Sequence, residues 1–523
     1  MMKKNWILKE NKHYNILVSI LKNREIENIE SYLNPKIEDL NDFTLLKDID
    51  KAVDRIFQAL INKEKIMIFG HDDVDGITSV FILYNYLTKL GSQYHYSYIP
   101  NREIEGHGMK SGFINKVKEI GINLVITVDG GICCYDKIEA LSEMGIDTII
   151  TDHHIPPEKL PNAYAIINPK QADCKYPFDM LAGVGVTYAL ISIMSKKTGI
   201  PLSKDDILMT ALGTIADRVP LIYDNRIFSK IGLRYLRTSR NKFINFVTYQ
   251  NSELSTNNLL NLIIKLMNAG RSTDGNHLAL EVLFIEDYFK IRALYNKLSY
   301  ILKEYDIQQR TAFALIDELY QNNNNNIFIH LDDNAIPLPL IGSVASYVNS
   351  KYHIPAVILK SNGQIITAEA RGPEGFNFVE LFNSISDLLI QYGGHKRAAG
   401  FSAELKNYEH IRNRMIDFVS NGKYNFCKKD DIVIDYQLDK HAFDMNELIN
   451  INKQMYPFGE NNYRPIYLIK NLPMNELYKF PFSQGAFQNI EGEILDIVFT
   501  VDEENSRLCI VDCMRSGFSQ NSG

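Results

Sequence analysis

The sequence contains little cysteine and no long apolar run, and each absence excludes a class of protein. Its six cysteines include no CxxC pair, so we expect neither a zinc ribbon nor a dense disulfide framework, and the chain suits a reducing compartment. No window approaches the roughly eighteen apolar residues that a membrane span needs, and the N-terminus has lysines but no apolar core of signal-peptide length. We therefore expect a cytoplasmic protein that does not enter a membrane.

An excess of positive charge is also missing, because the formal net charge is −7. Phosphate contacts need Lys and Arg, so this balance lowers the expectation of nucleic-acid binding. The reduction is modest, since net charge averages over all surfaces and metal ions can neutralise several Asp residues. The composition, with 45% hydrophobic and 23% charged residues among 523, is typical of a globular protein of roughly three or four domains.

The most informative stretch is IMIFGHDDVDGITSV, residues 66–80, in which apolar residues run into His71, Asp72, Asp73 and Asp75. The apolar run predicts a buried parallel strand, and the acidic cluster would lie at its carboxyl end, where open α/β sheets bind ligands. Because three carboxylates this close repel one another unless a cation neutralises them, the cluster indicates a divalent metal site. The alternative is an acidic turn that caps the next helix, and this stretch alone does not decide between the two.

Strands and helices alternate after this stretch. We expect strands at 66–70, 94–100, 124–128, 147–151 and 163–169, and helices at 78–90, 110–120 and 135–144. Such alternation predicts a parallel sheet with helices on its faces. Two more of these strands end in chemically competent residues, one in Asp129-Gly130-Gly131 and the other in Asp152-His153-His154. Three strands thus deliver metal-competent ligands to one edge of the sheet.

Asp217 follows an apolar helical stretch at 208–221. A single Asp in such a place is more often a helix cap than a ligand. With the other clusters present, we favour a ligand.

The motifs HDDVDG, VDGG, DHH and GTIAD, in this order and separation, resemble the four signature motifs of the DHH phosphoesterase superfamily. The closer resemblance is to its RecJ branch, the single-strand-specific 5′ exonucleases. It extends over nearly the whole chain, through segments such as NPKIEDLNDFTLLKDIDKAVDRI, INPKQADCKYPFDMLAGVGV, GGHKRAAGF and PFGENNYRP.

The resemblance implies an α/β fold with a parallel-sheet DHH domain, a helical connector, a smaller α/β DHHA1 domain and a C-terminal OB-like β-barrel. The expected bounds are 1–60 for an N-terminal helical segment, 61–235 for DHH, 236–320 for the connector, 327–425 for DHHA1 and 427–523 for the OB-like domain. Inside the last two domains we expect strands at 327–331, 355–360, 364–371, 431–438, 463–469, 491–501 and 506–513, and helices at 342–350 and 378–391.

The resemblance also implies a site that holds two divalent metal ions. Because the ligands of this site include imidazoles, Mn²⁺ is preferred, and Mg²⁺ is the other candidate. The implied ligands are His71, Asp73, Asp75, Asp129, His153 and Asp217. His154 would contact the scissile phosphate, and Asp152 would orient the histidines. His71 and Asp72 stand where RecJ proteins commonly have an Asp and an aromatic residue. Asp72 is either an extra carboxylate of the site or a solvated one, and we favour the solvated one.

Substrate contacts implied by the resemblance lie outside these motifs. Arg102 and Arg371 would surround a 5′ phosphate, Arg271 would lie near the strand backbone, and Gly393, Gly394 and His395 would offer amides and an imidazole to a phosphate or a base edge. Lys230, Arg234 and Arg237 fall on one helix face, which is either solvated or a phosphate track.

The resemblance implies an exonuclease that removes mononucleotides from the 5′ end of single-stranded DNA in DNA repair and recombination. We expect a monomer whose partners would be a helicase or a single-strand-binding protein. Two alternatives remain. One is a nanoRNase or cyclic-dinucleotide phosphodiesterase, although such chains are usually shorter. The other is a silent DHH scaffold that binds single strands, although such proteins lose several ligands and this chain keeps its acids and histidines.

Overall fold

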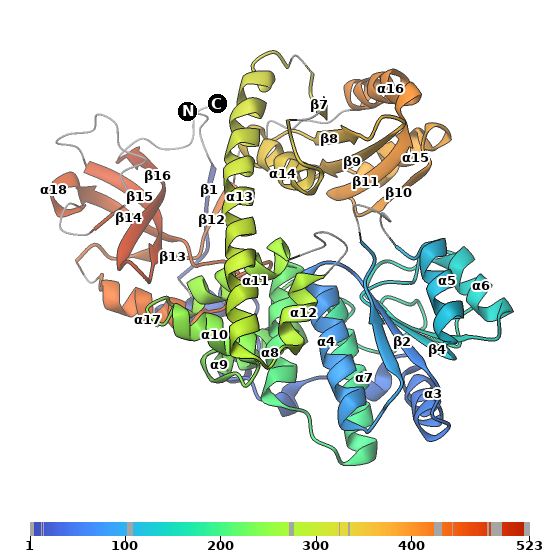
Figure 1. Ribbon diagram of the computed structural model, residues 1–523. Helices are drawn as coiled ribbons and strands as arrows, with labels where there is room; N and C mark the ends of the chain where they lie inside the picture. The colour runs from blue at the N-terminus through green and yellow to red at the C-terminus, as the bar shows by residue number, and fades with distance from the viewer. Residues whose placement is uncertain are drawn as a thin grey trace. The chain divides into compact units, whose positions relative to one another are not determined.

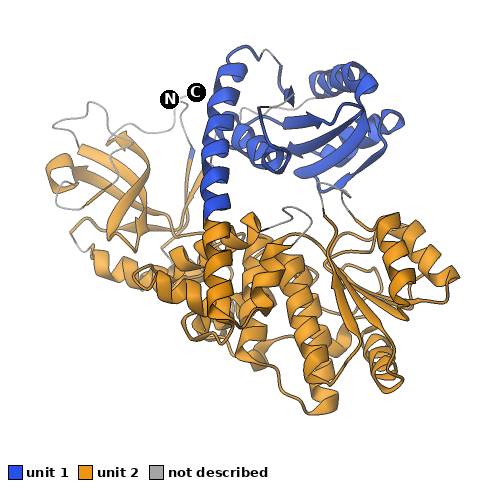
Figure 2. Ribbon diagram, in the orientation of Figure 1, with its two compact units in different colours: residues 1–5, 300–431 blue, residues 6–299, 432–523 orange. Residues whose placement is uncertain are grey.

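The computed structural model describes residues 5–11, 13, 15–101, 108–270, 277–323, 325–332, 335–422, 431–441, 443–477, 481–482 and 494–516 (Figure 1). The chain divides into two compact units, one made of residues 1–5 and 300–431 and the other of residues 6–299 and 432–523 (Figure 2). Among the described residues, no helix combines the length and the apolar character that crossing a membrane requires.

The larger unit contains a five-stranded parallel sheet, which confirms the predicted α/β class. Its strands are β2 (Ile66–Gly70), β3 (His95–Tyr98), β4 (Leu124–Val128), β5 (Asp147–Thr151) and β6 (Ala165–Ile167). They lie in the order β3-β2-β4-β5-β6, and each neighbouring pair is parallel. Every residue of β2 and β4 is buried, which explains their continuous apolar runs.

Helices cover both faces of this sheet (Figure 1). On one face, α5 (Ser111–Ile120) and α6 (Tyr135–Glu143) share a hydrophobic core with β2 and β4. On the other face lie α3 (Ile49–Ile61), α4 (Val74–Lys89) and α7 (Gly183–Thr198). Because the strands are parallel, the loops that follow them all begin at the same edge of the sheet.

A series of helices follows the sheet and ends in the long α13. These are α8 (Lys204–Ala216), α9 (Tyr223–Arg234), α10 (Lys242–Gln250), α11 (Thr256–Ala269), α12 (Leu278–Phe284) and α13 (Tyr288–Tyr320). Ser203, Asn241 and Ser255 cap α8, α10 and α11 by accepting hydrogen bonds from backbone N–H groups. The chain passes from one unit to the other within α13 (Figure 2).

The smaller unit contains a mixed five-stranded sheet in the order β10-β11-β9-β8-β7. Its strands are β7 (Phe328–Asp332), β8 (Ala356–Ser361), β9 (Ile365–Arg371), β10 (Gln391–Gly394) and β11 (Ala398–Glu404). The pair β7 and β8 is parallel, and the other pairs are antiparallel.

Helices cover both faces of this second sheet as well. Helix α14 (Ile341–Tyr352) packs on one face, and α15 (Phe378–Ser384) and α16 (Tyr408–Asn421) pack on the other. The helix expected over 378–391 is wrong beyond Ser384. The reason is tertiary, because residues 391–394 form a strand that pairs with β11.

The first and last segments of the larger unit share one hydrophobic core. Strand β1 (Asn5–Leu8) pairs with β12 (Asp431–Ile434), while α1 (Ile16–Asn23) and α2 (Ile29–Leu33) pack against a four-stranded sheet. Its strands in order are β13 (Tyr436–Leu438), β14 (Tyr467–Pro473), β15 (Ile494–Asp502) and β16 (Arg507–Arg515), with α17 (Met445–Met455) and α18 (Met474–Leu477) beside them. This mostly antiparallel sheet is consistent with the expected OB-like domain.

Candidate metal centre

The metal-competent side chains that the sequence singled out come together at the carboxyl edge of the parallel sheet. They are His71, Asp73 and Asp75 after β2, Asp129 after β4, Asp152, His153 and His154 after β5, and Asp217 at the end of α8. Three groups each bring their ligand atoms within 4.8 Å of one another: Asp129 with His153 and His154, His71 with Asp73 and Asp129, and Asp75 with His153 and Asp217.

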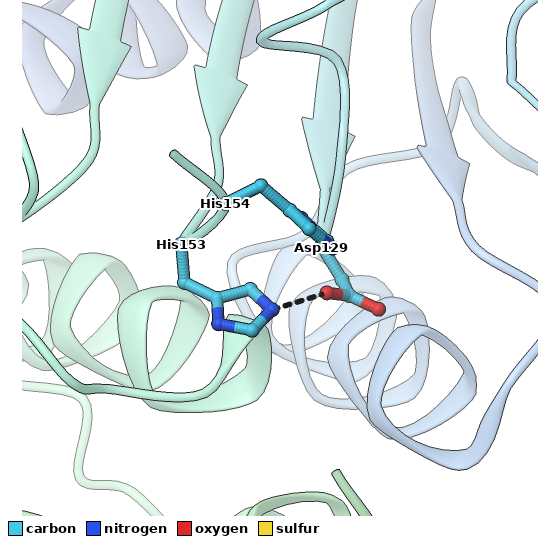
Figure 3. A group of neighbouring side chains, drawn as sticks. All are labelled: Asp129, His153 and His154. Atoms are coloured by element: carbon cyan, nitrogen blue, oxygen red, sulfur yellow. Dashed lines mark ion pairs between the residues drawn. The ribbon is translucent and has the colours of Figure 1, made fainter. Parts of the chain in front are cut away.

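His153 and Asp129 lie at the centre of the cluster. Figure 3 shows the ion pair between His153 and Asp129. His153 Nε2 is 3.2 Å from Asp129 Oδ1, 3.8 Å from Asp217 Oδ2 and 3.9 Å from Asp75 Oδ2. The other oxygen of Asp129, Oδ2, is 4.0 Å from His71 Nδ1, which is itself 2.9 Å from Asp73 Oδ2. Asp129 therefore faces a different imidazole with each oxygen, as a carboxylate shared by two ions would.

Backbone N–H groups hold two of these carboxylates in place. Asp73 caps α4 by accepting a hydrogen bond from Gly76 N at 2.9 Å, so the helix begins at Val74 and not at the expected residue 78. The predicted helix cap is therefore confirmed at Asp73, and the same residue also lies in a cluster that could hold a metal ion. Asp75 accepts hydrogen bonds from the N–H groups of Gly183 at 2.7 Å and Val184 at 2.8 Å, at the N-terminus of α7.

A glycine allows α7 to approach Asp129 closely. A Cβ atom at Gly183 would lie 2.5 Å from the Cβ of Asp129 and 2.6 Å from its Oδ1. Asp129 itself has a left-handed backbone, with φ 54°, which is uncommon for a residue other than glycine. Such strain persists where the surrounding structure fixes the conformation, as it does here between β4 and α7.

Asp152 is buried and holds the two histidines that follow it. Its Oδ1 accepts hydrogen bonds from His153 N, His154 N and His154 Nδ1, and its Oδ2 accepts one from Ile132 N. Although burial acts in the opposite direction, the hydrogen bond and charge of His154 hold the pKa of Asp152 well below its usual value. The same contact raises the pKa of His154 against the effect of burial. The backbone of the pair is fixed as well, since Asn168 and Lys170 donate to the carbonyls of His154 and His153.

The acids of the cluster are buried close enough to oppose one another's ionisation. Burial, followed by repulsion from Asp73, raises the pKa of Asp75 to about 7. Burial and the charges of Asp75 and Asp73 also raise the pKa values of Asp129 and Asp217 well above the usual value. A divalent cation among these carboxylates would remove the repulsion, so the cluster has the charge that a cation site requires.

His153 provides a separate test of whether a metal fits. Both of its ring nitrogens are buried, and neither makes a hydrogen bond to any residue that the structure describes. Burial, with a contribution from His154, lowers the pKa of His153 to about 3, so the ring is neutral and its lone pair is available. A buried imidazole nitrogen without a hydrogen bond, directed at three carboxylates, fits a metal ion.

Asp72 is not solvated, and this expectation is wrong. Its side chain is 5% exposed, and its Oδ1 lies 3.7 Å from His71 Nε2. The turn that starts α4 places the carboxylate beside the imidazole and away from water. His71 therefore contacts two acids of its own loop, Asp72 and Asp73.

The residues expected to contact substrate divide between described and undescribed parts of the chain. Arg102 and Arg271 lie outside the described residues. In the smaller unit, Arg371 Nη1 forms an ion pair with Glu369 Oε2 at 3.0 Å. Arg371 pairs with Ala398 and Gly394 with Ala399, so Arg371 and Gly394 flank adjacent positions of β11. Gly393 and Gly394 end β10, and His395 closes the following turn by donating its N–H to Ala398 O at 2.7 Å.

The chain matches two known domain families. Residues 65–214 match the N-terminal domain of the DHH family, and residues 299–421 match the DHHA1 domain. The single-stranded-DNA-specific exonuclease RecJ of Haemophilus influenzae is 30% identical over 417 residues, which cover 74% of this chain and 71% of that protein. The chain belongs to the RecJ family.

Other RecJ proteins match over more of the chain. The single-stranded-DNA-specific exonuclease RecJ of Bacillus subtilis is 31% identical over 525 residues, which are 97% of this chain but 63% of the relative, so this chain spans less than two thirds of that protein's length. The crystal structure of RecJ from Thermus thermophilus in complex with Mn²⁺ has a TM-score of 0.81 to this chain at 20% identity, and the match covers 98% of this chain and 80% of that one. This likeness confirms the RecJ fold.

Several residues that contact the predicted site residues of this RecJ-family chain, within one unit or the other, were not anticipated. Gly183 contacts Asp129, and Lys170 donates to the carbonyl of His153. Both contacts join residues distant in sequence, so local pattern does not reveal them. Glu369 carried a usable signal, because it is two residues before Arg371 on a strand and therefore shares its face.

Proposed function

We propose that this chain is a metal-dependent exonuclease that removes mononucleotides from the 5′ end of single-stranded DNA, in DNA repair and recombination. The observation that carries the proposal is the convergence of acids and imidazoles on Asp129 and His153 at the carboxyl edge of the sheet. The two relatives named above are single-stranded-DNA-specific exonucleases, which supports both the reaction and the strand.

The proposed metal ligands are His71, Asp73, Asp75, Asp129, His153 and Asp217. The imidazole ligands favour Mn²⁺ over Mg²⁺, and the T. thermophilus RecJ was solved in complex with each of these ions. When bound, two such ions supply a water of lowered pKa and positive charge beside the phosphoryl and leaving oxygens. Asp129 faces both halves of the site and is the residue whose loss should cost most.

The proposed role of His154 is to contact the scissile phosphate, while Asp152 positions it. His154 Nδ1 lies 2.8 Å from Asp152 Oδ1, so the proposed phosphate contact would be made by Nε2. The side chain of His154 is 45% exposed, compared with 8% for His153, so it is the more accessible of the two. Its raised pKa favours the imidazolium, which binds phosphate oxygens more strongly than a neutral ring does.

The proposed substrate contacts follow the family resemblance. Arg371 and Arg102 would bind the 5′ phosphate, Arg271 the strand backbone, and Gly393, Gly394 and His395 a phosphate or base edge. The guanidinium of Arg371 suits an anionic chain end because it can donate two parallel hydrogen bonds. Its ion pair with Glu369 restricts the orientation of that guanidinium.

The test is digestion of single-stranded DNA labelled at its 5′ or its 3′ end, with Mn²⁺ or Mg²⁺, beside RNA, duplex DNA and dinucleotides. We expect mononucleotides to appear first from the 5′ end of the DNA strand, and the Asp129→Asn variant to be inactive. The Asp136→Asn variant, which changes an exposed acid of α6, is the matched control and should remain active. Release from the 3′ end first, or hydrolysis of dinucleotides alone, would contradict the proposal.

The family resemblance further suggests a monomer that works beside a helicase or a single-strand-binding protein. Light scattering of the purified chain measures its mass directly, and a dimer would contradict this part of the proposal. A helicase should permit digestion of a duplex that the chain alone leaves intact.

A further inference from the structure

Asp217 is held differently from two other proposed ligands. Asp73 and Asp75 accept hydrogen bonds from backbone N–H groups, whereas no described residue donates a hydrogen bond to the Asp217 carboxylate. The position of that carboxylate therefore depends on its own backbone. The backbone is fixed on one side by the bond from Asp217 N to Gly213 O, at 2.9 Å, and on the other by residues 218–222, the linker to α9.

The linker is short and conformationally restricted. Arg218 at its start has φ 60°, and Tyr223 just after it has φ 43°, both in the left-handed region that side chains disfavour. Two hydrogen bonds fix its middle. Pro220 O accepts from Asn225 Nδ2 at 3.0 Å, and Leu221 N donates to Glu460 O at 2.8 Å. The second bond comes from the C-terminal part of the chain.

Glu460 belongs to the turn at 457–462, within the segment PFGENNYRP that the proposed function leaves without a role. Gly459 and Asn462 exchange backbone hydrogen bonds of 3.1 Å across this turn. Leu221 is 2% exposed and packs against it, and a Cβ atom at Gly459 would lie 2.7 Å from Leu221 Cδ1 and 3.1 Å from Cγ. Glycine at 459 is thus what allows the linker to pack against the turn.

Buried side chains also attach the 457–462 turn to α9. Asn462 donates from Nδ2 to Met455 O at 3.1 Å and Pro457 O at 2.6 Å. Arg226 of α9, which is 3% exposed, donates from Nη1 to Met455 O at 3.2 Å and from Nε to Tyr32 O at 2.9 Å. Cationic donors at the last carbonyls of α17 also suit its helix dipole.

Lys230 of α9 adds a further attachment. Its ammonium donates to Gln454 O, which lies one residue before the end of α17. Neither of the roles predicted for Lys230, a solvated position or a phosphate contact, agrees with this bond. Helix α9, the end of α17 and the 457–462 turn are therefore joined at several points.

We propose that the 457–462 turn positions Asp217, so that the C-terminal part of the chain is a positioning element of the metal centre. Leu221 transmits the position of the turn to the linker, and the linker sets where the Asp217 carboxylate lies relative to His153. This inference rests on the proposed function, because it takes Asp217 to be a metal ligand. Residues that hold a ligand in place typically change metal affinity by about 10–100-fold when they are altered.

The test measures Mn²⁺ affinity by isothermal titration calorimetry in four forms of the full chain: the wild type, Gly459→Val, Asp217→Asn and the double variant. We expect Gly459→Val to weaken Mn²⁺ binding by about tenfold, because its side chain displaces Leu221. In the Asp217→Asn background the same change should have no further effect, since the ligand it displaces is already lost.

Leu495→Ala is the control for general destabilisation, because Leu495 is buried in the same C-terminal core and its strand partners are Leu472 and Arg515, not residues of the turn. It should lower thermal stability and leave Mn²⁺ affinity unchanged. If Gly459→Val does not fold by circular dichroism, Leu221→Ala takes its place in the cycle.

Three outcomes would overturn the inference: unchanged Mn²⁺ affinity in a folded Gly459→Val or Leu221→Ala variant, equal losses in the wild-type and Asp217→Asn backgrounds, or wild-type affinity in Asp217→Asn itself. None of these measurements needs nuclease activity. A chain that binds Mn²⁺ but digests no strand would contradict the proposed function, and the cycle would still decide the positioning role.

Discussion

Adding one methyl group at Gly183 should disable the metal centre. In Gly183→Ala the new Cβ would lie 2.5 Å from Asp129 Cβ and 2.8 Å from Asp129 Cα, which are not flexible side-chain ends that could move aside. Relief of this overlap requires a shift of about 1 Å between α7 and the β4 loop, and misplacement of that size can cost about 10²-fold in rate. We expect overpacking to lower the free energy of unfolding by about 1–3 kcal/mol.

The matched control is Gly185→Ala, one half-turn further along α7. A Cβ there would meet Leu181 Cδ2 at 3.4 Å, an ordinary contact, and alanine in a helix interior is favoured over glycine by about 0.5–1 kcal/mol. The assays are urea unfolding, Mn²⁺ titration and digestion of 5′-labelled single-stranded DNA. Wild-type Mn²⁺ affinity and rate in Gly183→Ala would refute the argument that this glycine sets the position of Asp129.

Three more predictions follow from contacts and charges already described. Asp152→Asn should lower the free energy of unfolding by about 1–3 kcal/mol in chemical denaturation. The amide has a single oxygen, which cannot accept hydrogen bonds from both Ile132 N and the histidines, so its NH₂ group would face an N–H group that also donates. Chelation of the metal should lower the melting temperature more at pH 8 than at pH 5. The pKa of Asp75 is raised to about 7 in the metal-free fold, so that fold loses stability as the pH rises from about 4 through 7. Burial and the charges of Arg226 and Arg234 lower the pKa of Lys230 in the folded chain to about 7. Above that pH the unfolded chain binds a proton at Lys230 that the folded chain has lost, so stability should rise toward pH 10. Lys230→Met should flatten this rise in melting experiments at different pH values, and Lys453→Met should not.

The parallel sheet and the position of the site could be predicted from sequence because both depend on local signals. Continuous apolar runs identify strands buried on both faces, such as β2 and β4, and the carboxyl ends of parallel strands meet at one edge. Any acid or imidazole that directly follows such a strand is therefore brought to that edge. Asp129 and His153 were identified in this way, and the structure places them 3.2 Å apart.

Other features could not be predicted because contacts distant in sequence decide them. Asp72 resembles a solvated acid in its own loop, and only the folded turn shows it beside His71. The apolar positions after 378 continue a helical pattern, but pairing with β11 ends the helix at Ser384. Lys230 lies on a helix face with other basic residues, yet the partner of its ammonium is a carbonyl more than two hundred positions away in the chain.

The acids of the centre are held together by the fold and not by any attraction between them. Asp73 and Asp75 are fixed by backbone N–H groups, and Asp129 by the approach of α7 at Gly183, so their repulsion cannot be relieved by moving apart. Burial, together with that repulsion, raises the pKa values of Asp75, Asp129 and Asp217. A cation that enters such a site meets ligands already in position, so little of its binding free energy is spent on ordering them. No described backbone N–H donates to the carboxylate of Asp217, which is therefore the proposed ligand whose position the rest of the chain can most readily change.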